Sequence, residues 1–232
     1  IGFLVLVELS SLKLFGEKAR KIKHQLSVSS KLALVTSLIL IIYGTVLIFF
    51  GELNSNTIGF NLFERVFNAY FQSASARTCG FNTVDIANLT TFSALTLILL
   101  MWIGASPGGT GGGIKTTTFA IAIIYLFNYI RGKEKVELFN RQIADETIKR
   151  ALTIIFVSVG FLCLSSAVLI LLEPDKNPLN LLFESASALG TVGLSRNVTF
   201  NIGDGAKITL ILTMFIGRIG VLTFLMAFFK PV

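Results

Sequence analysis

Long apolar runs without charge alternate along this chain with shorter polar and basic segments. Residues 32–50 form a run of 19 residues and residues 151–172 a run of 22, and neither contains a charged side chain. A helix rises by about 1.5 Å per residue, so each run is long enough to cross a hydrocarbon layer of about 30 Å. The pattern therefore predicts a membrane span at each of these places.

Two further apolar runs are interrupted. Residues 91–130 would measure roughly 60 Å as a single helix, about twice the thickness of the layer. We expect this run to break in the glycine-rich segment 104–113, because glycine is a poor helix former. The last run, residues 206–229, contains one charged residue, Arg218, and is predicted to be the final span.

The composition agrees with an all-α integral membrane protein. The 232 residues are 53% hydrophobic and only 14% charged, whereas soluble domains carry about 25% charged residues. This excludes a conventional soluble enzyme and a disordered protein. Two cysteines, Cys79 and Cys163, and a single histidine, His24, provide no disulfide framework, zinc site or Ser-His catalysis. We therefore expect no enzymatic activity, no cofactor and no catalytic residue.

The basic residues predict how the chain crosses the membrane. Residues 13–31 and 131–150 each contain six lysines and arginines, whereas residues 51–90 and 173–205 each contain two. Basic segments stay in the cytoplasm, so we expect a multi-pass protein of the cell membrane with the two richer segments inside. Topology then explains the net charge of +7, and no nucleic-acid partner is expected.

The beginning of the chain is apolar, without a methionine or a basic leader. Residues 1–30 are predicted to be the end of a preceding helix followed by a basic cytoplasmic segment. We therefore expect the chain to be the C-terminal portion of a longer protein.

The chain also repeats itself. The sequence Phe-x-Ser-Ala-Ser-Ala occurs at 71–76 and at 183–188, and residues 96–104 match 209–217 at seven of nine positions. The offset between the copies is 112 residues in the first block and 113 in the second, after one inserted residue, Gly190. The regular offset predicts two duplicated units: a first unit over 31–130 and a second unit over 151–232, joined by a cytoplasmic linker over 131–150.

Each unit contains a short helix between its two spans. The predicted short helices, 63–76 and 178–188, are too short to cross a bilayer and are expected to be re-entrant or interfacial. A non-helical backbone that follows them must be buried in protein or line a water-filled path, because lipid cannot satisfy its polar groups.

A repeated tetrapeptide follows each short helix. Backbone carbonyls can replace the hydration shell of a cation, and glycine gives the backbone the positive φ that such a filter requires. The sequence therefore predicts two cation-filter segments, although glycine turns capping interfacial helices are the alternative. The predicted filter residues are Thr78, Cys79, Gly80 and Phe81 in the first unit, and Thr191, Val192, Gly193 and Leu194 in the second.

The glycine-rich segment superficially resembles a phosphate-binding loop. That loop requires lysine directly after its last glycine, whereas Ile114 separates Gly113 from Lys115 here, so nucleotide binding is not expected. A run of glycines inside a membrane instead suggests a movable plug below the filter. The predicted gate consists of Gly108, Gly109, Thr110, Gly111, Gly112, Gly113 and Arg218.

These motifs resemble the Trk/Ktr/HKT superfamily of potassium transporters, most of all the Ktr-type membrane subunit. Thr191–Leu194 looks like a potassium-channel filter, and the segments 75–83 and 106–116 are close to the family's third-unit pattern. Arg218 matches the basic residue of the fourth unit. The resemblance implies that the chain is units three and four of four span–pore helix–span units around one pore, in a pseudo-fourfold potassium-channel-like fold. It also implies an intramembrane gating loop. Cys79 departs from the small apolar residue expected at its position.

The predicted function is potassium uptake as the ion-conducting subunit, with K⁺ as the transported ion and coupling to Na⁺ left open. The resemblance implies as partners membrane lipid, the N-terminal half of the same transporter, a second subunit in a homodimer, and a cytosolic nucleotide-binding regulatory subunit of the RCK type. The alternatives are an ATP-driven permease subunit, which predicts a coupling helix and no duplicated Thr-x-Gly, and a non-conducting membrane scaffold, whose filter glycines would tolerate bulky substitution.

Overall fold

The structure is a computed structural model that describes residues 2–14, 27–55, 59, 61–132, 136–138 and 141–227. The described part is built almost entirely of helices. They are α1 (Phe3–Leu14), α3 (Val28–Gly51), α4 (Leu62–Ser75), α5 (Thr91–Trp102), α6 (Thr116–Ile130), α7 (Asp145–Leu172), α8 (Pro178–Gly190), α9 (Asp204–Ile219) and α10 (Val221–Met226). Short 3-10 helices, η2 (Ile86–Asn88) and η3 (Thr199–Asn201), follow the two predicted filter segments.

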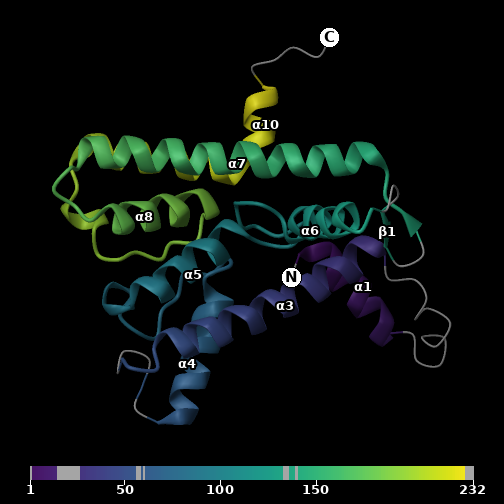
Figure 1. The fold of residues 1–232 in the computed structure, drawn as a ribbon, viewed down its shortest axis with the longest axis horizontal. Helices are drawn as coiled ribbons and strands as arrows, with labels where there is room; N and C mark the ends of the chain where they lie inside the picture. The colour runs from purple at the N-terminus through teal and green to yellow at the C-terminus, as the bar shows by residue number, and fades with distance from the viewer. Residues whose placement is uncertain are drawn as a thin grey trace.

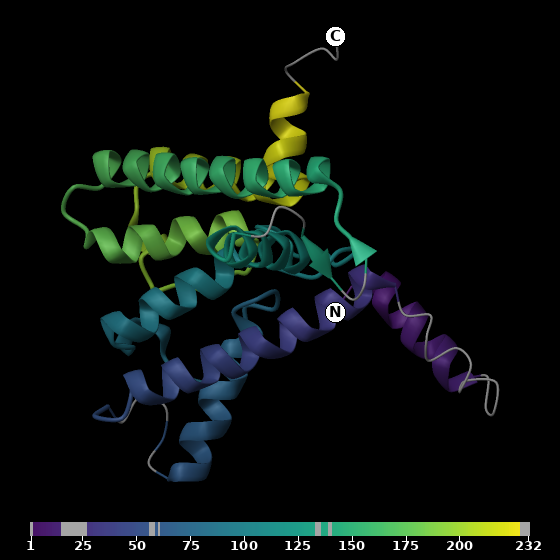
Figure 2. The same cartoon turned by 45° about the vertical axis from the view of Figure 1, so that its right-hand side comes forward.

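The helices fall into the two units that the repeat predicts. In Figure 1, α7 and α8 lie side by side in the upper half, whereas α3, α4 and α5 form the lower half. Helix α6 lies between the two groups, and Figure 2 keeps this separation after the molecule is turned. By length and apolar character, α3 and α7 are each able to cross a membrane.

The two units meet where α5 packs on α8. Leu97 and Met101 of α5 and Phe183 of α8 are fully buried in one apolar core. Burying one such side chain stabilises a fold by about 1.5–3 kcal/mol. The contact between the units is therefore part of the hydrophobic core and stabilises the fold. This core fixes the second unit's short helix, and hence its filter segment, against the first unit.

The glycine-rich segment interrupts the second apolar run of the first unit. Helix α5 begins with the side chain of Thr90 accepting from the Ser93 N–H, and it ends at Trp102. Ile103 then forms a parallel bridge with Ile114, close to the start of α6. The segment 104–113 is therefore a loop whose two ends lie next to each other. We call it the gate loop.

The run 206–229, predicted to be the final span, is not one continuous helix. Helix α9 ends at Ile219, and Gly220 has φ 95° and ψ 127°, a conformation that L side chains rarely adopt. Helix α10 then points away from α7, as the yellow helix in Figure 1 shows. Residues 228 and 229 lie outside the described part of the chain.

The linker predicted over 131–150 contains structure that the sequence did not indicate. Strands β1 (Glu137–Leu138) and β2 (Arg141–Gln142) form a small antiparallel hairpin. Helix α7 then begins at Asp145, six residues before the apolar run at 151. Its first turn contains two acidic residues, which favour a helix N-terminus.

Candidate functional site: two filter segments above a glycine-rich loop

The first filter segment, Thr78–Phe81, is anchored to the end of α4 by Ser75. The Ser75 carbonyl oxygen accepts from the N–H groups of Cys79 at 2.9 Å and Gly80 at 3.3 Å. The Ser75 hydroxyl donates to the Phe81 carbonyl oxygen. Gly80 has φ 69°, in the left-handed region. The chain is therefore turned tightly at the end of the short helix, and the Phe81 side chain is 69% exposed in this chain.

The second filter segment, Thr191–Leu194, repeats this anchoring at Ser187. The Ser187 carbonyl oxygen accepts from the Val192 N–H at 2.9 Å, and its hydroxyl oxygen accepts from the Gly193 N–H at 3.1 Å. Thr191 ends α8 with φ 52°, which is strained for a residue other than glycine. The side chains of Val192 and Leu194 are buried in the core. The anchoring therefore directs these side chains into the protein.

The structure brings the two filter segments into direct contact. A Cβ on Gly80 would lie 2.1 Å from the carbonyl oxygen of Val192, so only glycine allows this approach of the two backbones. Around Gly193, which has φ 97°, nothing lies within 4 Å of the place of a Cβ. The two glycines are thus required for different reasons: Gly80 for contact and dihedral, Gly193 for the dihedral alone.

The gate loop is bonded to the second filter segment and packs on the first. The Gly112 N–H donates to the Thr191 hydroxyl oxygen at 2.7 Å and to the Gly190 carbonyl oxygen at 3.1 Å. A Cβ on Gly111 would lie 2.9 Å from the methyl group of Thr78. The loop therefore contacts the threonine of each filter segment.

Two cationic side chains hold carbonyl oxygens of the gate loop. Arg218, the last residue but one of α9, donates from Nη1 to the Thr110 carbonyl oxygen. Lys115 donates from Nζ to the Gly111 carbonyl oxygen at 2.6 Å. The structure thus brings Arg218 and the predicted gate loop together, and it adds Lys115, which the sequence reasoning did not assign to the gate.

A network of charged side chains holds the chain just after the second filter segment. Glu184, which is 5% exposed, accepts from the Ser195 hydroxyl at 2.7 Å, the Arg196 N–H at 2.9 Å and the Thr199 hydroxyl at 2.7 Å. The Arg196 side chain crosses to the first unit, where it donates to the Ala87 carbonyl oxygen at 2.8 Å. The network therefore ties one filter segment's loop to its own short helix and to the other unit.

Neighbouring charges and burial shift the pKa of Arg196 in opposite directions. Burial lowers the pKa of its guanidinium below the ordinary value, whereas the carboxylates of Asp85, Glu52 and Glu184 raise it. The three carboxylates thus favour the charged form of an arginine that is partly withdrawn from water.

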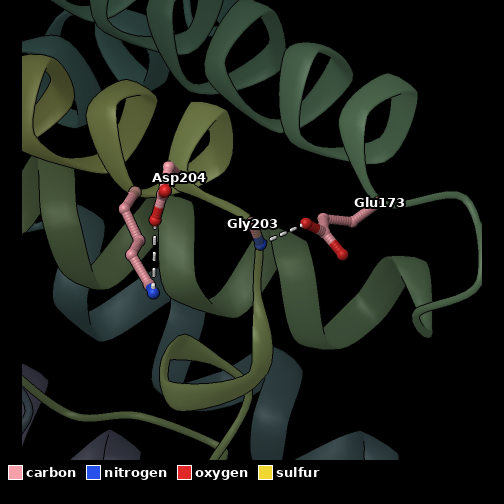
Figure 3. Close-up of polar contacts among 4 residues, drawn as sticks. Glu173, Gly203 and Asp204 are labelled. Atoms are coloured by element: carbon pink, nitrogen blue, oxygen red, sulfur yellow. Dashed lines mark hydrogen bonds and ion pairs between the residues drawn. The ribbon is translucent and has the colours of Figure 1, made fainter.

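A glutamate at the end of each first span forms the same clasp in both units. Glu52 accepts from the Thr90 N–H at 2.8 Å, and Glu173 accepts from the Gly203 N–H at 2.6 Å. Figure 3 shows the Glu173 carboxylate reaching the residue that precedes α9. Thr90 and Gly203 are the N-cap residues of the second spans. Each carboxylate therefore satisfies a free N–H and complements the positive end of a helix.

Sequence reasoning missed these supporting residues. Ser75 and Ser187 lie inside the repeated hexapeptide, so the repeat itself was a signal that could have found them. Glu184 has Gln72 at the equivalent position, which donates to the Thr83 hydroxyl at 3.4 Å. The support that Glu184 gives to the second filter segment is therefore only partly duplicated in the first unit. The role of Glu184 depends on loops that come together in three dimensions.

No side-chain cluster for a metal is found among the described residues: none groups three or more histidine, cysteine, aspartate or glutamate side chains. Backbone carbonyls and threonine and serine hydroxyls provide oxygen atoms at the filter segments, and the Glu184 carboxylate bonds to the residues just after the second one. Backbone carbonyls of this kind suit a large, weakly hydrated monovalent cation.

Comparison with known proteins places this geometry in context. The family described as TrkH, cation transport protein, matches residues 1–232. The chain is 37% identical over 226 residues to the Ktr system potassium uptake protein D of Bacillus subtilis, covering 97% of this chain and 49% of that protein. It is 39% identical over 217 residues to the Ktr system potassium uptake protein B of Vibrio alginolyticus, covering 91% and 47%. The chain therefore spans about half the length of these relatives.

The fold has a counterpart among solved structures. The crystal structure of the potassium transporter TrkH from Vibrio parahaemolyticus matches with a TM-score of 0.74 at 17% identity, covering 100% of this chain and 49% of that one. This likeness confirms the predicted helical membrane fold of span–short helix–span repeats. The family model and the Ktr relatives confirm the resemblance to the Trk/Ktr superfamily. The roles of the individual filter and gate residues stay predictions.

Proposed function

Because this chain belongs to the TrkH cation transport protein family, and is thus a membrane protein, we propose that it forms part of the pore of a potassium uptake system. The observation that carries this proposal is the contact between the two filter segments, in which Gly80 meets the Val192 carbonyl. Two duplicated segments that meet in this way supply adjacent parts of one ring of oxygens. No chemical reaction is involved, and K⁺ is the transported ion.

The anchoring of each filter segment supports this role. Cys79 and Gly80 donate their N–H groups to Ser75, and Gly193 donates to Ser187. These donors therefore face the short helices. Carbonyl oxygens other than that of Phe81, which accepts from the Ser75 hydroxyl, are left as the groups able to face an ion. The C-terminal ends of α4 and α8 lie at the filter, where the negative end of a helix dipole favours a cation.

We propose the gate loop as a barrier on the cytoplasmic side of the filter. The loop contacts Thr78 and Thr191, and two cations, Lys115 and Arg218, hold its carbonyls. Positive charge beneath the filter raises the energy of a passing cation. Opening then requires these contacts to break. The basic linker over 131–150 is proposed to lie in the cytoplasm of a multi-pass protein of the cell membrane.

Two filter segments form only part of a ring around an ion, so further parts of the assembly are needed. The relatives are about twice as long, so we propose that an N-terminal half of the same transporter completes the ring. A homodimer and a cytosolic nucleotide-binding regulatory subunit, docked against the basic linker, complete the proposed assembly. Coupling to Na⁺ stays open.

The function is tested by uptake in cells that lack other potassium uptake systems. The complete transporter that contains this chain is expected to restore growth at limiting potassium and to take up rubidium as a tracer. A non-conducting scaffold would be inserted in the membrane at the same level without restoring either, and that result would reject the proposal.

Replacing Glu184 by glutamine is expected to weaken selectivity. Oε1 accepts from Ser195 and Arg196, and Oε2 accepts from Thr199. In glutamine one of these two oxygens is replaced by an NH₂ group, which cannot accept. A buried donor left without its partner costs about 1–3 kcal/mol. The preference for K⁺ over Na⁺ should therefore fall about tenfold. Competition of Na⁺ with rubidium uptake measures this, with Glu173→Gln as a control far from the filter. A lower melting temperature with unchanged selectivity would mean that Glu184 only supports packing.

A further inference from the structure

A cavity lies at the end of the molecule where α3 and α7 begin. Figures 1 and 2 place the beginnings of these two helices and strand β1 at this same end. The volume of the cavity is about 470 Å³, and its walls come from α3, the gate loop, α6, the hairpin region and α7. Ligand sites in proteins commonly measure about 300–1,000 Å³. The filter segments do not line this cavity, so it has room for a ligand away from them.

The walls of the cavity are largely apolar. Leu32 of α3, Ile121 of α6 and Ile154 of α7 line it, and Leu138 and Ile143 line it from the hairpin region. Aliphatic side chains from three helices and a hairpin can surround a hydrocarbon chain without leaving a polar group of the chain's surroundings unsatisfied. The cavity therefore suits an apolar ligand, or the apolar part of a larger one.

Arg150 is the charged side chain at this cavity. It is the only charged residue among the described residues that line it, and it also lines a smaller cavity of about 190 Å³ beside α10. Within the described ranges Arg150 has neither a hydrogen bond nor an ion pair, not even with Glu146 one turn earlier on α7. Arg196 and Arg218, in contrast, both donate to carbonyl oxygens. The guanidinium of Arg150 is therefore available to an anion.

The position of Arg150 along α7 places it at the membrane surface. It directly precedes residues 151–172, the run of 22 residues without a charge, so it lies where the hydrocarbon layer begins. The linker that ends at Arg150 is proposed to be cytoplasmic. Anionic lipids give the cytoplasmic leaflet a negative surface potential, and basic cavities between membrane helices on that side bind anionic head groups. A guanidinium can hold a phosphate through two parallel N–H groups.

We propose that this cavity binds one acyl chain of an anionic phospholipid, with the phosphate held by Arg150. The hydroxyls of Thr118 and Thr147, which also line the cavity, can donate to the phosphate oxygens. Arg150 repels the ammonium of a zwitterionic head group, and no acidic residue of the described lining attracts it. The bound chain contacts the gate loop at Pro107. The inference rests on the membrane placement given under the proposed function, and it does not require ion conduction.

The test uses two photoreactive lipids that differ only in their head groups. A phosphatidylglycerol and a phosphatidylcholine, each with a diazirine in one acyl chain, are added to phosphatidylcholine vesicles that contain the complete transporter. After illumination, mass spectrometry identifies the cross-linked residues. The phosphatidylglycerol probe is expected to label the helices around Ile121 and Ile154 at least about threefold more than the phosphatidylcholine probe. Unlabelled phosphatidylglycerol should compete, and inorganic phosphate should not.

Two neighbouring residues of α7 provide matched variants. Arg150 and Lys149 are both exposed, and only Arg150 lines the cavity. Arg150→Gln should lower the labelling by the phosphatidylglycerol probe to the level of the other probe, whereas Lys149→Gln removes the same charge and should leave it unchanged. Arg150→Lys should keep part of the preference. Because both side chains are exposed, the variants should reach the membrane at the parent's level with an unchanged melting temperature.

Four results would overturn the inference. Equal labelling by the two probes means that bilayer lipid enters without regard to its head group, and a full preference in Arg150→Gln means that the guanidinium does not hold the phosphate. Displacement by inorganic phosphate means that the site takes a free anion. Absence of any label in the lining means that another part of the complete protein fills the cavity. Cross-linking does not use ion flux, so rubidium uptake by the same vesicles separates failure of this site from failure of the proposed function.

Discussion

Replacing Gly80 by alanine in the complete transporter is expected to lower rubidium uptake at limiting concentration by more than about tenfold. The new Cβ would lie 2.1 Å from the Val192 carbonyl oxygen, and φ at this position is 69°. The two filter segments must therefore move apart, at a cost of well above ~1.4 kcal/mol, which corresponds to a factor of about ten. Gly193→Ala meets no neighbour within 4 Å, so only the strain of about 1–2 kcal/mol at positive φ remains. Its effect should be smaller.

The control for both variants is Gly160→Ala in α7. A Cβ at Gly160 also meets nothing within 4 Å, and this glycine lies inside a helix, away from the filter segments. Uptake, selectivity and membrane levels should match the parent protein. If Gly80→Ala and Gly193→Ala keep the parent's rubidium affinity and its preference for K⁺ over Na⁺, the two segments are not a filter.

Replacing Arg218 by glutamine is expected to raise flux roughly tenfold. The guanidinium holds the Thr110 carbonyl of the gate loop and places a positive charge below the filter. A like charge several ångströms from a passing cation raises its energy by a few kcal/mol in an environment of intermediate polarity. Removing the charge lowers that barrier and frees the loop at one end. Arg218→Lys keeps the charge and should keep most of the restriction.

Deletion of 109–112 tests the gate from the side of the loop. The deletion removes the Gly112 N–H that donates to Thr191 and the Gly111 carbonyl that holds Lys115. Flux per folded molecule should rise as in Arg218→Gln, with a modest change in melting temperature. A lower melting temperature with unchanged flux in both variants would show that the arginine and the loop only tie helices together.

The apolar pattern and the repeat together predicted much of the architecture. Length alone requires residues 91–130 to break, and α5 ends at Trp102 while α6 begins at Thr116. The turn at Gly220 had no such signal. It lies within an apolar run where a straight helix would satisfy lipid equally well. The direction of α10 depends on the conformation of one glycine and on packing against α7, neither of which is visible in hydropathy.

The support of the filter was hidden for a different reason. The repeat identified Thr-x-Gly in both units. In the sequence alone, however, nothing distinguishes Glu184 from any other polar residue of a short helix. Its function depends on Ser195 and Thr199 folding back over the end of α8. Arg196 likewise reads as a surface charge, although it reaches the first unit. Contacts between loops distant in sequence require the three-dimensional structure.

The most direct measurement is the position of bound ions in the complete transporter. Crystals grown in rubidium or thallium, analysed by anomalous scattering, should show ions beside the backbone carbonyl oxygens of Thr78–Phe81 and Thr191–Leu194, with no such peaks beside the gate loop at Arg218. Replacing Gly80 by alanine should remove them. If the ions bind elsewhere in the protein and leave both segments empty, the assignment of these segments as a potassium filter is contradicted.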